Sequence, residues 1–294
     1  RDRISTIRDL IPLAPLHNPA NLEGIIVLQE LHPSLPQVAV FDTAFHQSMP
    51  PSAYLYPLPY TLYKESGIRR YGFHGTSHAF VAKEAAQIIG EDLKKLNLIT
   101  LHLGNGASAA AIQSGKSIDT SMGLTPLEGL MMGTRCGDID PAIIPFISHN
   151  LKLDIDEIDT MLNKESGLKG ICETNDMREV VERSEQEDKM SQLALEMYAY
   201  RIKKYIGAYT VALGRVDAVI FTGGIGEHAV KVREMVCEGL NESIGLKIDQ
   251  TKNRVKSTEN RPIHDAESRI KLFVIRTNEE LEIAIQTEEV IAKG

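Results

Sequence analysis

Apolar residues follow two different spacings along the chain, and each spacing predicts its own kind of element. Continuous apolar runs of strand length occupy residues 38–42, 97–103, 216–221 and 272–275. A longer stretch at 187–213 has helical spacing, with apolar positions at Leu193, Met197, Tyr200, Ile206 and Val211. Because strands alternate with helices, we expect an α/β fold.

Local signals place the ends of several helices. Residues 77–89 also have helical spacing, and Ser77 is expected to cap that helix. Thr277 and Glu280 have the spacing of a capping box at the start of the last helix. Short helices are expected between residues 141 and 183, where helical patterns alternate with glycines.

Two glycine-rich segments are expected to be turns. Residues 104–106 predict a hairpin between the strand at 97–103 and a second strand at 108–113. Residues 223–226 are expected to connect a strand to a helix that begins near Glu227.

Composition narrows the class of protein. Of the 294 residues, 43% are hydrophobic and 24% are charged, enough to bury a sizeable core. The net charge of -8 argues against nucleic acid as a partner, which would require a basic face. No apolar run approaches the roughly 20 residues that cross a bilayer, so we expect no membrane segment. Three widely spaced cysteines fit a reducing compartment, and we expect a cytoplasmic protein.

His74 is the first candidate for chemistry, because it lies between glycines just before a predicted helix. Backbone N–H groups at a helix start favour an anion, and an imidazole beside them can donate to a phosphoryl oxygen. The spacing of His74 and His78 also occurs in zinc pairs, but Gly75 stands where the metalloprotease pattern requires glutamate. Two histidines that merely stabilise a turn are the structural alternative.

Asn105 and Arg135 are further candidates within glycine-rich stretches. Small residues around Asn105 allow backbone amides to close around phosphate oxygens, although an Asn-Gly pair often only turns a hairpin. Arg135 could neutralise charge on a transferring phosphoryl group. A surface ion-pair network with Asp138 and Asp140 is the alternative for this arginine.

Residues 221–227 read as strand, glycine turn and helix, which suits contact with a nucleotide although the full dinucleotide fingerprint is absent. Asp42 and Glu279 stand at a predicted strand end and a predicted helix start. Either could be an ordinary cap, but such a carboxylate pair could also hold Mg²⁺ with phosphates and water.

Taken together, these stretches resemble the acetokinase family, within the superfamily of acetate and sugar kinases, Hsp70 and actin. The similarity is closest at residues 72–78 and extends to residues 14–19, 41–46 and 119–129. It implies a ribonuclease H-like (actin-like ATPase) fold, with a mixed sheet flanked by helices and an incomplete first domain. It also implies a homodimer that transfers a phosphoryl group reversibly and directly in line from ATP to acetate, giving acetyl phosphate and ADP with Mg²⁺ or Mn²⁺.

The resemblance implies a role for each matching residue. Catalysis would use His74, Arg135 and Asp42, and the metal ion would be positioned by Asp42 and Glu279. The nucleotide would be bound by His102, Asn105, Gly106, Asp176, Met177, Arg178, Gly224, Ile225 and Gly226. The pocket for the acyl methyl group would be lined by Leu16, Phe73 and Pro126. Met177 stands where some relatives have an aromatic residue, so stacking on the adenine is less expected.

The chain also departs from the family pattern. It contains neither the phosphate loop of the form Asn-x-Gly-Ser-Ser-Ser-x-Lys nor the His-Arg-x-x-His-Gly-Gly segment, and it begins at Arg1 rather than Met. We therefore expect part of the first domain to be missing. Residues 1–44 would be its remnant, 45–278 the second domain, and 279–294 a helix that returns to the first. Propionate or butyrate kinase, or a nucleotide-binding fragment without activity, are the alternatives.

Overall fold

The structure is a computed structural model that describes residues 3–9 and 18–293. The chain divides into two compact units, Arg1–Phe41 with Glu280–Gly294, and Asp42–Glu279. Every candidate residue except Leu16 lies in the second unit. The assignment of these units to the domains of a kinase stays a prediction.

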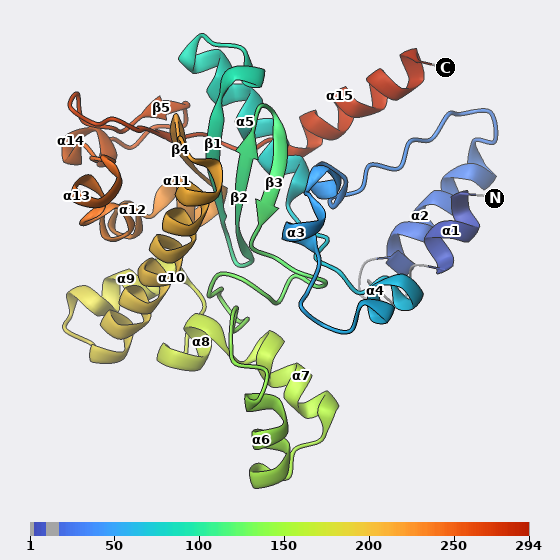
Figure 1. The fold of residues 1–294 in the computed structure, drawn as a ribbon, viewed down its shortest axis with the longest axis horizontal. Coiled ribbons are helices and arrows are strands. Elements are labelled where there is room, and N and C mark those ends of the chain that lie inside the picture. The colour runs from blue at the N-terminus through green and yellow to red at the C-terminus, as the bar shows by residue number, and fades with distance from the viewer. Residues whose placement is uncertain (1–2, 10–17, 294) are drawn as a thin grey trace. The chain divides into compact units, whose positions relative to one another are not determined.

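A six-stranded mixed sheet forms the centre of the second unit (Figure 1). Its strands are β1 (Asn97–Leu103), β2 (Ala107–Gln113), β3 (Lys116–Thr120), β4 (Ala218–Thr222), β5 (Arg261–Pro262) and β6 (Lys271–Val274), in the order β3-β2-β1-β4-β6-β5. β1, β4 and β6 are parallel, and the other pairings are antiparallel. The parallel strands have near-continuous apolar sequences because both of their faces are buried.

The hairpin at residues 104–106 and three of the four apolar runs are confirmed as predicted. The run at 38–42 is the exception, because these residues form no strand and Phe41 is 46% exposed. No strand of the described chain pairs with this run. An apolar run without a neighbouring strand cannot satisfy its backbone hydrogen bonds as a sheet does.

Strand β3 was not predicted. Ser114 and Gly115 turn the chain from β2 into β3, with φ values of 52° and 80°. Two consecutive residues with positive φ are typical of a tight hairpin turn. The Ser-Gly pair is therefore the sequence signal that would have predicted this strand.

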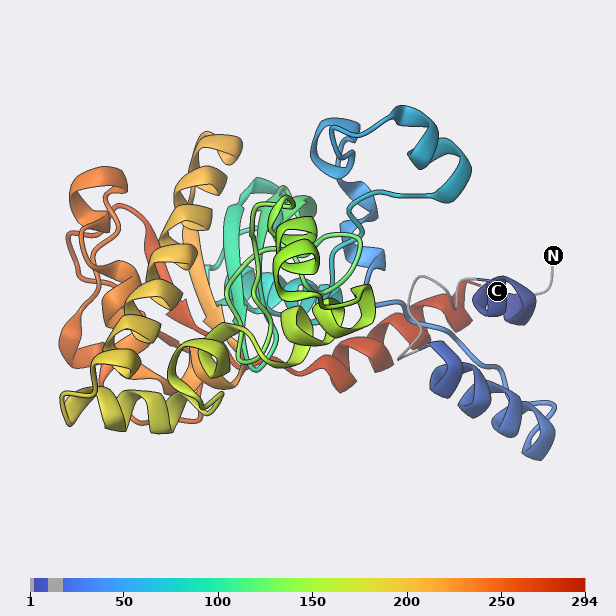
Figure 2. The ribbon, with the colours of Figure 1, turned by 90° about the horizontal axis from the view of Figure 1, so that it is seen from below.

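Helices cover both faces of the sheet (Figures 1 and 2). The helices of the second unit are η2 (Ala44–Ser48), α3 (Pro51–Tyr54), α4 (Tyr60–Ser66), α5 (Gly75–Ile89), η3 (Leu93–Lys95), α6 (Ile143–Leu151), α7 (Ile155–Lys164), α8 (Gly167–Cys172), α9 (Met177–Glu185), α10 (Lys189–Leu213), α11 (Gly223–His228), α12 (Val230–Cys237), α13 (Leu240–Ile244) and α14 (Gln250–Asn253). α5 packs with Leu98 of β1, whereas α10 packs with Ile99 and Leu101. Because neighbouring residues of a strand point to opposite faces, α5 and α10 lie on opposite faces of the sheet.

Several helix details differ from the expectation. α5 begins at Gly75 with His74 before it, so Ser77 is not its cap, and α11 begins at Gly223 rather than near Glu227. The capping box of the last helix does not form, because the Thr277 hydroxyl is buried without a hydrogen-bond partner. These ends depend on tertiary contacts that a local pattern does not contain.

The apolar residues that predicted α10 lie only partly on its buried face, where Ile206 is buried and Met197 packs against the core. Leu193, Tyr200 and Val211 are 42%, 61% and 82% exposed, whereas Ile202 and Tyr209 are buried. Further apolar residues, including Leu195 and Tyr198, complete the buried face.

The first unit contains α1 (Arg3–Asp9), α2 (Asn18–Leu31) and most of α15 (Glu279–Ala292). Across the described residues of both units, no helix is long and apolar enough to cross a membrane.

Candidate active site

The candidate residues gather at the carboxyl ends of β1 and β4. These strands are parallel neighbours, so the turns 104–106 and 223–226 leave the sheet at the same edge. Gly223 has φ +75°, and a Cβ on it would lie 2.8 Å from the carbonyl oxygen of Leu103. Only glycine allows this close approach of the second turn to the end of β1. Such an edge is a common ligand site in α/β folds.

His74 is positioned by a carboxylate from a distant segment. It precedes α5 in a left-handed conformation, φ 57°, which few residues other than glycine adopt. Asp42 accepts the backbone N–H of His74 at 2.6 Å and the hydroxyl of Thr76 at 2.9 Å. Asp42 thus supplies the cap that α5 lacks and stabilises the conformation of His74.

The imidazole of His74 is partly buried and neutral. Its Nδ1 lies 2.9 Å from the Ser108 hydroxyl, and its ring stacks on that of His102 with 4.2 Å between centroids. Burial lowers the pKa of His74 to about 4, and the positive charge of Arg135 acts in the same direction. Burial also lowers the pKa of His102 to about 3. Both rings are therefore uncharged at neutral pH.

Arg135 faces the same turn as His74. A Cβ on Gly106 would lie 3.3 Å from Nη1 of Arg135 and 3.5 Å from Nε2 of His74. The guanidinium donates to the carbonyl of Pro126 at 3.4 Å. Burial lowers the pKa of Arg135, and no acidic group of the described chain counteracts that shift. A half-buried guanidinium without a carboxylate partner, beside a neutral histidine, is suited to bind an anion with several oxygens.

Two alternatives for these residues are not realised. Asp138 accepts from the backbone of Gly129 and from the Tyr205 hydroxyl rather than from Arg135. His78 uses both ring nitrogens for hydrogen bonds to protein hydroxyls, which leaves none for zinc. Among the described residues, no group of three or more His, Cys, Asp or Glu is arranged to hold a metal ion.

Asn105 joins the loop of Arg135 to the start of α9. Gly133 donates its backbone N–H to the Asn105 carbonyl at 3.0 Å, and a Cβ on Gly133 would lie 2.2 Å from Asn105 Oδ1. The Asn175 amide donates to the same Oδ1 at 3.1 Å. Three segments that are far apart in the sequence therefore meet at Asn105.

The residues expected near adenosine lie on α9 and α11. Asp176 caps α9 and forms an ion pair with Arg178 at 2.6 Å, while the Arg178 side chain is 91% exposed. Met177 is 4% exposed and packs in the core, so its side chain is not available for a base. The first turn of α11 contains Gly224, Ile225 and Gly226, of which Gly224 is exposed.

Asp42 and Glu279 interact electrostatically and share Thr76 as a neighbour. Burial raises the pKa of Glu279, and the negative charge of Asp42 raises it further. Thr76 contacts both carboxylates. Mg²⁺ is often bound by only one or two carboxylates, with waters and phosphate oxygens completing its ligands, so this pair fits such an ion.

The expected acyl pocket is only partly described. Leu16 lies outside the described residues. Phe73 is partly buried against the core, and Pro126 contacts Arg135 through its carbonyl.

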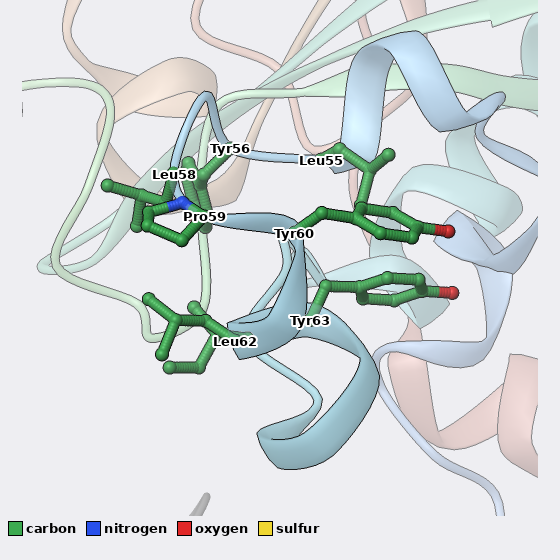
Figure 3. Close-up of a pocket in the computed structure, with 8 residues that line it drawn as sticks. Leu55, Tyr56, Leu58, Pro59, Tyr60, Leu62 and Tyr63 are labelled. Carbon is green, nitrogen blue, oxygen red and sulfur yellow. The ribbon is translucent and has the colours of Figure 1, made fainter.

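The segment that carries Pro126 is held by a polar network. Arg70 donates to Glu128 at 2.6 Å, and the Tyr56 hydroxyl donates to the same carboxylate. Tyr56 also lines a small cavity of about 30 Å³ (Figure 3). That volume suits about one water molecule, so this cavity does not bind a nucleotide or an acyl group.

Thr100 and Ser108, which form hydrogen bonds with His78 in the core behind His74, were not predicted from the sequence. Two signals were present. His78 lies one helical turn after His74, and Ser108 is the single hydroxyl in the alanine-rich strand β2. The pairing of these two signals depends on how α5 packs against the sheet.

Comparisons with known proteins agree over nearly the whole chain. Residues 1–285 match the model of the acetokinase family. An acetate kinase from Sulfurovum sp. (strain NBC37-1) is 64% identical over 290 residues, which are 99% of this chain and 73% of that protein. The crystal structure of Porphyromonas gingivalis acetate kinase superposes with a TM-score of 0.94 at 45% identity, covering 98% of this chain and 72% of that one. The crystal structure of a propionate kinase from Francisella tularensis subsp. tularensis SCHU S4 superposes with a TM-score of 0.92 at 49% identity. The match covers 98% of this chain and 73% of that one.

These matches include the sheet and the edge at which His74, Asn105 and Arg135 meet. The mixed sheet flanked by helices agrees with the actin-like ATPase fold expected from the sequence. By family match, sequence identity and structure, the chain belongs to the acetokinase family.

Proposed function

We propose that the protein is an acetate kinase, which transfers the γ-phosphoryl group of ATP to acetate and gives acetyl phosphate and ADP in a reversible reaction. The observation that carries the proposal is that neutral His74 and Arg135, which has no carboxylate partner among the described residues, converge on the turn at Gly106. Phosphoryl transfer depends mainly on positioning and charge neutralisation, and these two donors supply both.

His74 and Arg135 have different tasks in this account. Arg135 binds oxygens of the acetate and of the transferring phosphoryl group, because its planar fork carries a permanent charge. His74 donates a hydrogen bond from Nε2 to a phosphoryl oxygen without adding charge. Transfer is direct and in line, so no side chain acts as a nucleophile.

Mg²⁺, or Mn²⁺ in its place, is assigned to Asp42 and Glu279. Bound there with phosphate oxygens, the ion supplies positive charge to the transferring group. The Asp42 carboxylate accepts from the backbone N–H of His74 and from the backbone N–H and hydroxyl of Thr76, and it keeps a lone pair on Oδ2 for the ion. The mutual repulsion of the two carboxylates, which raises the pKa of Glu279, is what a cation relieves.

The nucleotide is assigned to the edge of the sheet. The phosphates lie along the turn that contains Asn105 and Gly106, beside His102. The adenosine lies toward the residues at the starts of α9 and α11: Asp176, Met177, Arg178, Gly224, Ile225 and Gly226. Only the backbone of Met177 takes part, since its side chain is buried.

The test is acetyl phosphate formation, trapped as the hydroxamate, by protein expressed from the complete reading frame. We expect product only when ATP, Mg²⁺ and acetate are all present. ATP hydrolysis at a rate that acetate does not change would exclude acetate as the acceptor.

Propionate is the second candidate acceptor, because a propionate kinase of known structure is 49% identical. One methylene changes binding by about 1–3 kcal/mol, or about 10–200-fold in kcat/KM. Measured kcat/KM values for acetate, propionate and butyrate identify the preferred acceptor. A higher kcat/KM for propionate than for acetate would make propionate the assigned substrate.

A cytoplasmic homodimer completes the proposal. The exposed apolar side chains of α10, Leu193, Tyr200 and Val211, support a contact between two copies. All three cysteines are free thiols, which fits a reducing compartment. Light scattering should then give twice the mass of the expressed chain.

A further inference from the structure

A chain of buried hydrogen bonds runs from His74 into the core between α5 and the sheet. The Ser108 hydroxyl lies 2.9 Å from His74 Nδ1 and 2.8 Å from His78 Nε2. On the far side of that ring, His78 Nδ1 lies 2.7 Å from the Thr100 hydroxyl. Ser108, His78 and Thr100 are completely buried. None of them has a part in the transfer described above.

The Ser108 hydroxyl has one proton and lies between two imidazole nitrogens. It donates to one of them and accepts from the other. Each ring carries a single proton, because burial lowers the pKa of His74 to about 4 and that of His78 well below its usual value. If Ser108 donates to His74, both rings are protonated at Nε2. If Ser108 donates to His78, both are protonated at Nδ1.

Thr100 decides between the two directions. In the described chain its hydroxyl has no hydrogen-bond partner other than His78. If His78 donated to Thr100, the hydroxyl proton of Thr100 would be buried without an acceptor, at a cost of about 1–3 kcal/mol. If Thr100 donates to His78 Nδ1, every group in the chain is satisfied. The favoured direction runs from Thr100 through His78 and Ser108 to His74.

We propose that Thr100, His78 and Ser108 form a positioning relay that fixes His74 as the Nε2–H tautomer and so presents a hydrogen-bond donor to the cleft. The inference rests on the proposed function only in one point, that the group accepting a hydrogen bond from His74 Nε2 is a phosphoryl oxygen. In the other tautomer, a lone pair at Nε2 would repel phosphoryl oxygens.

Other groups around His74 do not set this direction. Arg135 on its own favours a lone pair at Nε2, so the relay acts against it. His102 only stacks on the ring, and Asp42 bonds the backbone N–H. His46 takes no part, since its hydrogen bonds go to Ser117 and to the carbonyl of Phe73.

The test reads the tautomers directly, in protein expressed from the complete reading frame. Long-range ¹H–¹⁵N correlation spectra distinguish imidazoles protonated at Nδ1 from those protonated at Nε2. Through-space contacts and the spectrum of His74→Asn assign the signals. We expect Nε2–H forms for both His74 and His78. The inference is overturned if either ring is the Nδ1–H form.

Thr100→Val and Thr100→Ser form a matched pair of variants, since only the first removes the terminal donor. We expect Thr100→Val to lower the Nε2–H population of both rings and to lower kcat about tenfold, the value of one hydrogen bond. Thr100→Ser should restore both. A Thr100→Val protein with unchanged tautomers would overturn the relay, and the wild-type spectrum decides the matter even if that variant does not fold. The spectra do not depend on phosphoryl transfer. If they show the expected tautomers but the protein forms no acetyl phosphate, only the proposed function is refuted.

Discussion

Among residues 3–9 and 18–293, Arg135 and His74 have no strong partners where they face the turn at Gly106. Arg135 donates only to the Pro126 carbonyl and the Met132 sulfur, and no carboxylate of the described chain is paired with it. Burying a guanidinium in this way costs free energy that packing elsewhere offsets. An anionic phosphoryl group is the partner that would recover it.

Substitution of Arg135 tests this residue most severely. We expect Arg135→Ala to lower kcat by about 10³–10⁵, as for other arginines in phosphoryl transfer. The kcat of Arg135→Lys should lie between those of Arg135→Ala and the wild type, because lysine keeps the charge but not the planar fork. Arg215→Ala, at an exposed ion pair elsewhere, is the control and should match the wild type. An Arg135→Ala enzyme with more than a tenth of wild-type kcat would remove Arg135 from the mechanism.

Buried neutral histidines also make stability depend on pH. Burial lowers the pKa of His46 to about 4, below the ordinary value of about 6.5. Between these values the unfolded chain binds a proton that the folded protein does not, so stability falls as pH falls below about 6.5. His46 alone should contribute a loss of about 1 kcal/mol at pH 5.5.

Urea unfolding at pH 7.5 and 5.5 measures this loss. His46→Asn should be less stable at pH 7.5 but lose less on acidification, whereas exposed His228→Asn should behave as the wild type. An equal loss in His46→Asn and wild type would contradict the assignment to His46.

At the scale of elements, α5 depends on a glycine in the segment before it and on another at its C-terminal cap, for different reasons. Gly72 and Gly90 both have positive φ, 76° and 75°. A Cβ on Gly72 would lie 2.4 Å from Thr120, whereas a Cβ on Gly90 would meet nothing within 4 Å. Gly72 must therefore be glycine for both space and conformation, and Gly90 for conformation alone.

Alanine substitutions separate these two causes. Gly90→Ala should lower the free energy of unfolding by about 1–2 kcal/mol, the cost of a left-handed residue with a side chain. Gly72→Ala should cost clearly more, about 3–4 kcal/mol, because the clash adds to that strain. Chemical denaturation measures both, and equal losses would show that the contact with Thr120 yields at no cost.

The strands were predictable because burial on both faces leaves a continuous apolar run, as in β1 and β4. Arg135 was noticed because glycines surround it. The cap by Asp42 and the bonds behind His74 were not predictable, because their partners lie about thirty residues apart and meet only after packing. The exposure of Leu193, Tyr200 and Val211 on α10 was not predictable for the same reason.

At the scale of the whole second unit, the sheet edge brings together segments from Asp42 to Glu279. The two carboxylates belong to the ends of this unit, so a metal ion bound by both depends on its fold being intact. We expect Asp42→Asn to raise the Mg²⁺ concentration needed for half-maximal activity. Asp249→Asn, at the cap of α14, is the matched control. An unchanged metal titration in Asp42→Asn would refute the metal role.

The central claim is that the transferring phosphoryl group lies between His74 and Arg135. The most direct measurement is a crystal structure of the protein with ADP, Mg²⁺, acetate and a metal fluoride that mimics the planar phosphoryl group. The account predicts that fluoride atoms lie about 2.7–3.1 Å from His74 Nε2 and from an Arg135 guanidinium nitrogen, in line between acetate and ADP. A mimic bound out of reach of both side chains would contradict it.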